Sequence, residues 1–138
     1  MGQFIFEQFR KEILEKSKNA GACATRYRAA LEATTTVDFM NVVFRNFDWL
    51  SDNIFLKIED IPQKLWDRCQ ILNCSNNQLV SLPELPQCEE LDCSNNQLVS
   101  LPELPKCEVL DCRNNQLVSL PELPQCKVLY CDNNQLVK

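Results

Sequence analysis

One segment of eleven residues, repeated three times without a change, restricts the fold of this chain more than any other feature. Asn-Asn-Gln-Leu-Val-Ser-Leu-Pro-Glu-Leu-Pro stands at 76–86, 95–105 and 114–124, and a fourth copy begins at Asn133. The period is therefore 19 residues. A fixed period of this kind is typical of a solenoid, in which each repeat buries its apolar side only by stacking on its neighbours.

The other half of each repeat carries an apolar pattern that predicts a short strand. One unit reads Cys88-Glu89-Glu90-Leu91-Asp92-Cys93-Ser94-Asn95-Asn96-Gln97-Leu98. This resembles the leucine-rich-repeat pattern L-x-x-L-x-L-x-x-N-x-L, with cysteine at the first and third leucine positions. Four copies starting at 69, 88, 107 and 126 fill every position of the pattern, although the last is truncated. The resemblance covers 69–138, about half the chain.

This resemblance implies a leucine-rich-repeat solenoid with one parallel strand per repeat on a concave face and a returning segment on the convex side. The short L-P-x-L-P form is similar to repeats of bacterial effectors and giant-virus proteins. This similarity implies a repeat protein that binds other proteins. The similarity to giant-virus proteins would make it a viral protein directed at its host. The period lies just below the family's usual range of about 20–29 residues, so the coil should be thin.

The returning segment cannot be helical. Pro102 and Pro105 lie three apart in it, and a proline inside a helix costs about 3 kcal/mol. Polyproline II has about three residues per turn, which places the prolines on one side and Leu101 and Leu104 on another. We therefore expect a polyproline-like convex side with leucines toward the core.

The cysteines and one asparagine of each repeat are expected to form inward structural columns, because the cysteines replace core leucines and free cysteine packs as a small apolar residue. These core columns are Cys69, Cys88, Cys107 and Cys126, then Cys74, Cys93, Cys112 and Cys131, then Asn77, Asn96, Asn115 and Asn134. The asparagine amides should satisfy backbone groups at the turn after the strand.

Zinc and disulfides are the alternatives for these cysteines. Within a repeat the C-x4-C spacing along a strand separates the sulfurs by on the order of 15 Å, whereas zinc needs each within about 2.3 Å. Disulfides between neighbours in a column are sterically conceivable but not expected inside a cell. We expect no metal and no cofactor.

The N-terminal half predicts an α-helical capping region over 1–60, ahead of the solenoid over 61–138. Helical spacing favours helices at about 3–18, 22–33 and 36–50, and residues 53–58 suggest a short strand. In the second helix Cys23, Tyr27 and Leu31 should share an inward face.

Ile61–Trp66 resembles a longer return segment. The helices should cap the exposed end of the solenoid, the alternative being a docking domain such as an F-box-like adaptor. The fold class is thus α+β.

The residues beside the inward leucine of each strand should face the concave surface. They form three columns: Ile71, Glu90, Val109 and Val128; Asn73, Asp92, Asp111 and Tyr130; and Ser75, Ser94, Arg113 and Asp132. Elsewhere the repeats are nearly identical, so variation concentrates where the coil does not dictate the residue. The candidate partner-binding residues are Glu90, Asp92, Val109, Asp111, Arg113, Val128, Tyr130 and Asp132. Drift on a solvated face would give the same variation.

Charge and composition limit the kinds of molecule that this chain is expected to bind. Residues 67–138 hold ten acids and five bases and carry the whole net charge of −5. This argues against nucleic acid, and it fits either a basic protein partner or solubility alone. No stretch reaches the ~18 apolar residues of a membrane span, and the N-terminus does not resemble a signal peptide. We expect a cytoplasmic protein, in the host cytoplasm if it is viral.

No catalytic constellation stands out, since the chain has no histidine and no glycine-rich phosphate loop. We expect a non-enzymatic interaction module. The alternative is a structural or self-assembling component. The fourth repeat stops after 13 of its 19 residues, and an uncapped C-terminal edge there would associate with a partner or with another copy as a homodimer.

Overall fold

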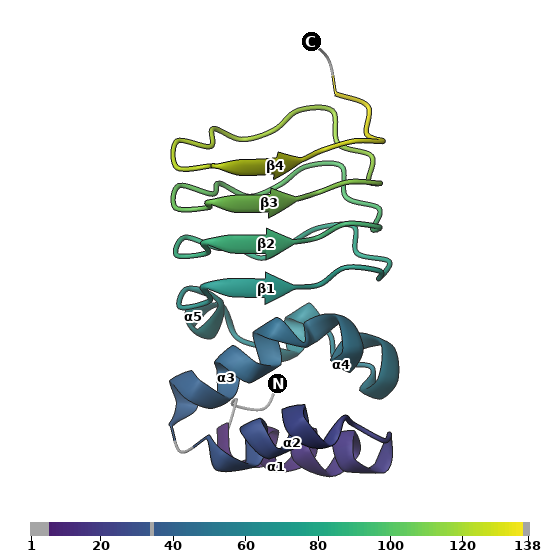
Figure 1. Cartoon of the computed structure of the whole chain (residues 1–138), viewed down its shortest axis with the longest axis vertical. Coiled ribbons are helices and arrows are strands. Elements are labelled where there is room, and N and C mark those ends of the chain that lie inside the picture. The colour runs from purple at the N-terminus through teal and green to yellow at the C-terminus, as the bar shows by residue number, and fades with distance from the viewer. Residues whose placement is uncertain (1–5, 34, 137–138) are drawn as a thin grey trace.

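The computed structural model describes residues 6–33 and 35–136, in which a helical part precedes a stack of coils (Figure 1). The helices are α1 (Phe6–Asn19), α2 (Ala24–Glu32), α3 (Thr36–Arg45), α4 (Phe47–Ile54), the short 3-10 helix η1 (Ile58–Asp60) and α5 (Gln63–Trp66). The strands are β1 (Ile71–Asn73), β2 (Glu90–Asp92), β3 (Val109–Asp111) and β4 (Val128–Tyr130).

The four strands form one parallel sheet in the order β1-β2-β3-β4, so each strand pairs with the next one along the chain. The central leucine of each strand pairs with its equivalent one repeat later. Leu72, Leu91 and Leu110 are at most 2% exposed, because each points into the interior of the stack. The parallel-strand solenoid expected from the repeats is therefore the architecture of residues 69–136.

The return segments of the three complete repeats contain no helix or strand within the described residues. Leu85 and Leu104 are at most 1% exposed, whereas Pro105 lies at the surface. Each turn after a strand places an asparagine in the left-handed region, at φ between 57° and 59°: Asn76, Asn95, Asn114 and Asn133. Asparagine tolerates this backbone better than most residues, which fits its invariance here.

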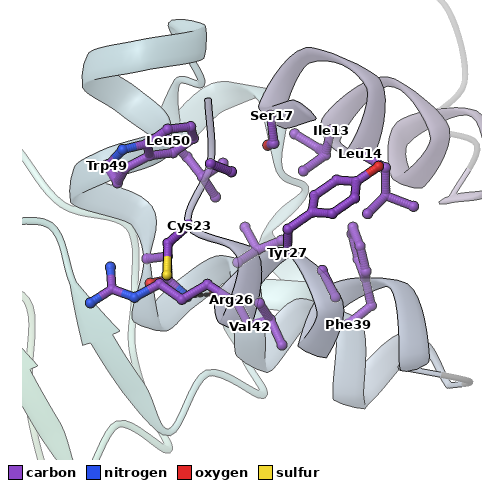
Figure 2. Close-up of a pocket in the computed structure, with 14 residues that line it drawn as sticks. Ile13, Leu14, Ser17, Cys23, Arg26, Tyr27, Phe39, Val42, Trp49 and Leu50 are labelled. Carbon is purple, nitrogen blue, oxygen red and sulfur yellow. Dashed lines mark hydrogen bonds between the residues drawn. The ribbon is translucent and has the colours of Figure 1, made fainter. Parts of the chain in front are cut away.

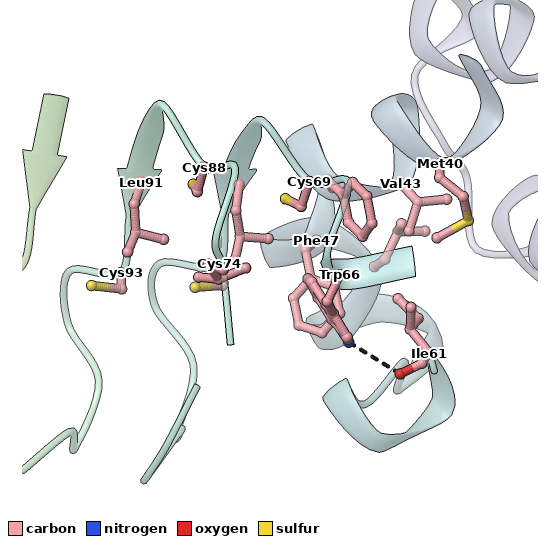
Figure 3. Packing of buried hydrophobic residues seen from close by; sticks show 14 of the residues in the cluster. Met40, Val43, Phe47, Ile61, Trp66, Cys69, Cys74, Cys88, Leu91 and Cys93 are labelled. Atoms are coloured by element: carbon pink, nitrogen blue, oxygen red, sulfur yellow. Dashed lines mark hydrogen bonds between the residues drawn. The ribbon is translucent and has the colours of Figure 1, made fainter. Parts of the chain in front are cut away.

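The helices and the coils share one hydrophobic core. The buried face of α3 and the start of α4 lie against the first coil, with Phe44 stacked on Trp66 at a centroid distance of 4.9 Å. Figure 3 shows Phe47 and Trp66 beside Cys69, with the cysteine columns continuing away from the helices. The Trp66 indole Nε1 donates a hydrogen bond to the Ile61 carbonyl at 3.1 Å, so its polar atom is satisfied inside the core.

Three expectations about the N-terminal half were wrong in detail. The helix expected over 36–50 is two helices, because the chain bends at Asn46, whose side chain caps the carbonyl of Val42 at 2.8 Å. No strand forms at 53–58, where Phe55 adopts φ 62° and ends α4. Ile61–Trp66 contains α5, since Pro62 at the N-cap does not obstruct the turn that follows it.

The first helix ends at Asn19, close to the expected end at about 18, and residues 3–5 of its expected range lie outside the described residues. None of the described helices combines the length and the apolar character needed to cross a membrane.

Candidate functional site

Parallel register aligns the variable side chains of the strands into columns on one surface. Glu90, Val109 and Val128 occupy successive places in one column, and Asp92, Asp111 and Tyr130 occupy successive places in the next. Their neighbour in each strand is an inward leucine, so strand alternation turns both columns outward. We call the following set the strand face: Glu90, Asp92, Val109, Asp111, Arg113, Val128, Tyr130 and Asp132.

The third column expected on this surface is only partly there. Ser75 and Ser94 are 5% and 6% exposed, and their hydroxyls donate to Asn73 Oδ1 at 2.8 Å and to Asp92 Oδ1 at 2.7 Å. These serines close tight side-chain turns after the strand and do not face a partner. Arg113 and Asp132 replace them in the last two repeats, and both are exposed.

A charged and aromatic group occupies the centre of the strand face. Arg113 donates to both carboxylate oxygens of Asp111, from Nε to Oδ1 at 3.0 Å and from Nη2 to Oδ2 at 2.8 Å. Its guanidinium carbon lies 4.9 Å from the ring centroid of Tyr130, which is within cation–π distance. The hydrogen bond from Arg113 lowers the pKa of Asp111, and the Asp111 carboxylate raises the pKa of Arg113.

This arrangement changes the charge that a partner would meet. Four carboxylates, those of Glu90, Asp92, Asp111 and Asp132, and one guanidinium give the strand face a net charge of −3. The pairing leaves Asp111 engaged, while Glu90 and Asp132 are exposed at its margins. Arg113 therefore neutralises the charge of Asp111, and Glu90, Asp92 and Asp132 supply the net charge of −3.

Apolar side chains also reach this surface. Val128 is 38% exposed and Tyr130 is 47% exposed, while Val109 is half-buried between neighbouring coils. A partner that covers Val128 and Tyr130 would remove apolar area from water, and aromatic residues of this kind are frequent anchors at interfaces.

Sequence reasoning missed a further variable column beside the strands. Gln70, Glu89, Glu108 and Lys127 occupy the same place in successive repeats, and the backbone N–H of each of the last three donates to the carbonyl of the residue before it in this column at 2.7 to 2.8 Å. Lys127 and Glu108 form an ion pair at 2.9 Å, which lowers the pKa of Glu108 and raises that of Lys127. The signal was available, because this position varies between repeats as much as the three columns do.

The cysteine columns lie inside the stack. Cys69, Cys74, Cys88, Cys93, Cys107 and Cys112 are fully buried, while Cys126 and Cys131 in the last coil are partly exposed. Burial raises the pKa of Cys107 and of Cys112 to about 12, which keeps both thiols protonated. Across the described residues no group of three or more acidic, cysteine or histidine side chains is placed to hold a metal ion.

The inward asparagines bridge successive coils. Asn96 Nδ2 donates to the carbonyls of Cys74 and Cys93 at 3.1 and 3.0 Å, and its Oδ1 accepts from the Leu79 N–H at 3.0 Å. Asn115 and Asn134 make the equivalent bonds one and two coils later. Asn77 lies in the first coil, and its side-chain amide donates to the carbonyls of Cys74 and Ser75 within that coil.

Cys23 lies elsewhere than expected. It precedes α2 and is exposed, and Leu31 is 48% exposed, so Cys23, Tyr27 and Leu31 do not form one buried face, although Tyr27 is half-buried against the other helices. The helix begins at Ala24, two residues later than the spacing suggested, which leaves the cysteine at its N-terminal cap.

No protein-family model matches this chain, and no curated protein matches it. Among solved structures the chain is similar to YopM, described as a leucine-rich effector protein from Yersinia pestis with a novel molecular architecture. The two share 29% sequence identity with a TM-score of 0.48 over 96% of this chain and 31% of YopM. The chain therefore spans less than a third of the length of YopM.

Proposed function

We propose that this protein is a non-enzymatic protein-interaction module that binds a protein partner through the strand face. The observation that supports this most is the contrast between constant and variable positions. The eleven-residue turn and return sequence is identical in three repeats, whereas the aligned outward positions of the strands differ from repeat to repeat. The fold dictates the first set and leaves the second free for recognition.

The proposed partner carries basic groups around an apolar contact. The strand face has a net charge of −3 with Glu90 and Asp132 exposed, and Val128 and Tyr130 supply the apolar area. Basic side chains on the partner would be attracted to these carboxylates and would speed the encounter. Neither nucleic acid nor a membrane surface fits this charge.

The proposed location is the cytoplasm, or the host cytoplasm if the chain is viral. Six fully buried free thiols line the coils, and a reducing compartment preserves such thiols. We further propose that residues 1–60 serve as the N-terminal cap of a short-type leucine-rich-repeat solenoid over 61–138 with a polyproline-like convex side. The shared core between α3, α4 and the first coil supports this role.

A paired-variant experiment tests the binding surface. Glu90→Lys with Val128→Arg places two positive charges on the strand face, and the control pair Glu103→Lys with Val118→Arg makes the same changes at exposed return positions. Affinity purification from the native cell, followed by mass spectrometry, should lose partners only with the first pair. Both pairs should unfold within about 0.5 kcal/mol of the parent chain, since all four sites are exposed. Equal partner recovery from both variants would contradict the proposal.

A second candidate function rests on the last coil. Leu129 is 41% exposed although its equivalents in the other strands are at most 2% exposed, and β4 pairs only with β3 among the described strands. Pairing of β4 with a second copy would cover this edge and give a homodimer or a larger structural assembly. Light scattering at high micromolar concentration should then show a dimer that Leu129→Lys dissociates. A monomer at that concentration would exclude this candidate.

A further inference from the structure

We infer that the helical part holds a second binding site, a pocket among α1, α2, α3 and α4 for a small, mainly apolar molecule that carries one hydroxyl or carbonyl group. This site is separate from the strand face and does not depend on the function proposed for it. It rests on a hollow in the helical packing, on a buried polar atom inside it and on an accessible rim.

The hollow lies where the four helices meet. Figure 2 shows Ser17 of α1 and Leu50 of α4 on one side, Val42 and Phe39 of α3 on another, and Tyr27 of α2 between them. The hollow has a volume of about 60 Å³, and about 510 Å³ is empty when the part open to solvent is included. Since one water needs roughly 10–15 Å³ and benzene fills a cavity of roughly 150 Å³, the hollow can take several waters, or part of a small ring whose remainder lies in the open mouth.

Ser17 gives the pocket its specific polar feature. The residue is 6% exposed, it lines the hollow, and its Oγ is buried without a hydrogen-bond partner. A serine inside a helix either faces solvent or bonds the carbonyl one turn earlier, and buried polar atoms are nearly always paired. An unpaired hydroxyl among apolar walls therefore calls for a ligand group that can donate to it or accept from it. A hydroxyl or carbonyl group meets this need, and the apolar walls select the rest of the molecule.

The rim of the pocket is open and contains a reactive group. Gly21, at φ 83°, turns the chain after α1, and Cys23 then lies exposed at the N-terminus of α2 beside Arg26. Backbone N–H groups of Arg26 and Thr25 lower the pKa of the Cys23 thiol. Trp49 lines the same hollow. Its indole resonance and the reactivity of the Cys23 thiol can therefore both report binding.

Phenol and toluene form a matched pair of probes, since both are single rings of similar size and only phenol has a hydroxyl. Titration into ¹⁵N-labelled protein should shift the Trp49 indole resonance, with phenol binding roughly fivefold tighter, as expected for one net hydrogen bond. Ser17→Ala should remove this preference and leave toluene binding unchanged. Ala22→Leu, which fills the hollow, should prevent binding of both, while Ala29→Leu on the exposed side of α2 should not.

Alkylation of Cys23 by iodoacetamide gives an independent reading, since an occupied pocket should slow it in the parent chain and in Ala29→Leu but not in Ala22→Leu. Two results would overturn the proposal. In the first, neither probe shifts Trp49 at millimolar concentration, which would mean that water alone fills the hollow. In the second, phenol binds Ser17→Ala as tightly as the parent chain, which would mean that the Ser17 hydroxyl makes no hydrogen bond to the ligand.

Discussion

At the scale of single residues, two adjacent asparagines in each repeat have different physical roles. The first, such as Asn95 at φ 58°, supplies the left-handed turn, and its exposed amide is bonded by the next asparagine of its column, from Asn114 Nδ2 to Asn95 Oδ1 at 2.8 Å. The second, such as Asn96, is buried and satisfies backbone groups of two coils. Each asparagine therefore has its own structural reason to be the same in all four repeats, the first for the turn and the second for the buried hydrogen bonds.

Asn96→Ala should lower the free energy of unfolding by about 2–4 kcal/mol, because it leaves buried carbonyls and the Leu79 N–H without partners. Urea denaturation measures this loss. The neighbouring control is Gln97→Ala, which changes an exposed side chain and should cost less than about 0.5 kcal/mol. Equal losses in the two variants would show that the amide contributes nothing beyond its volume.

The nine cysteines should differ sharply in reactivity toward iodoacetamide. Cys23 is exposed and its pKa is lowered by backbone N–H groups, so its thiolate fraction rises at lower pH than that of an ordinary thiol. The repeat cysteines are buried or half-buried, and burial raises the pKa of Cys107 and Cys112 to about 12. Peptide mapping at pH 7.5 should find Cys23 modified first and the buried thiols modified only in denaturant. Simultaneous labelling in the folded state would contradict this.

At the scale of elements, the end of α4 is the position where the local sequence fits its backbone least well. Phe55 adopts φ 62° and ψ 31° while 76% exposed, and its N–H bonds the Leu50 carbonyl. A left-handed conformation costs a side chain with Cβ about 1–2 kcal/mol, and little apolar burial offsets it here. Local sequence predicts a strand at this point, and the packing of Leu56 and Ile61 into the core decides otherwise.

Phe55→Gly should therefore stabilise the protein by up to about 1 kcal/mol, since glycine adopts this backbone freely and its greater entropy when unfolded offsets only part of the gain. Thermal unfolding would show a small rise in Tm. Phe55→Ala is the control, because it removes the ring but keeps Cβ and should give no such rise. A destabilised glycine variant would mean that the Phe55 ring makes contacts that matter to the fold.

At the scale of the whole molecule, one continuous core should make the helices and the coils unfold together. Phe44 is 1% exposed and stacks on Trp66 at the junction between α3 and the first coil. Phe44→Ala should cost about 3–5 kcal/mol, as expected for a cavity at a buried aromatic. Hydrogen exchange should report faster opening in β1 and β2 as well as in α3. Faster exchange confined to the helices would mean that the two parts fold independently.

The repeats by themselves determined most of the solenoid. A period of 19 residues with one apolar strand pattern forces each coil onto the next, so the parallel order, the inward leucines and the non-helical return follow from the sequence alone. The two outward columns beside the inward leucine follow too, because side chains alternate along a strand with a period of two, whereas the third column is buried at Ser75 and Ser94. What repeats strictly is predictable, since each copy has the same neighbours as the last.

The tertiary structure decided what does not repeat. The sequence does not show that Arg113 reaches back to Asp111 and covers Tyr130, or that Ser94 turns inward to Asp92, because these contacts depend on side-chain directions at coil ends. Nor does it show the break at Asn46, the left-handed Phe55 or the hollow beside Ser17. Helical periodicity identifies the apolar faces, but only packing against three other elements fixes where a helix bends and where space is left over.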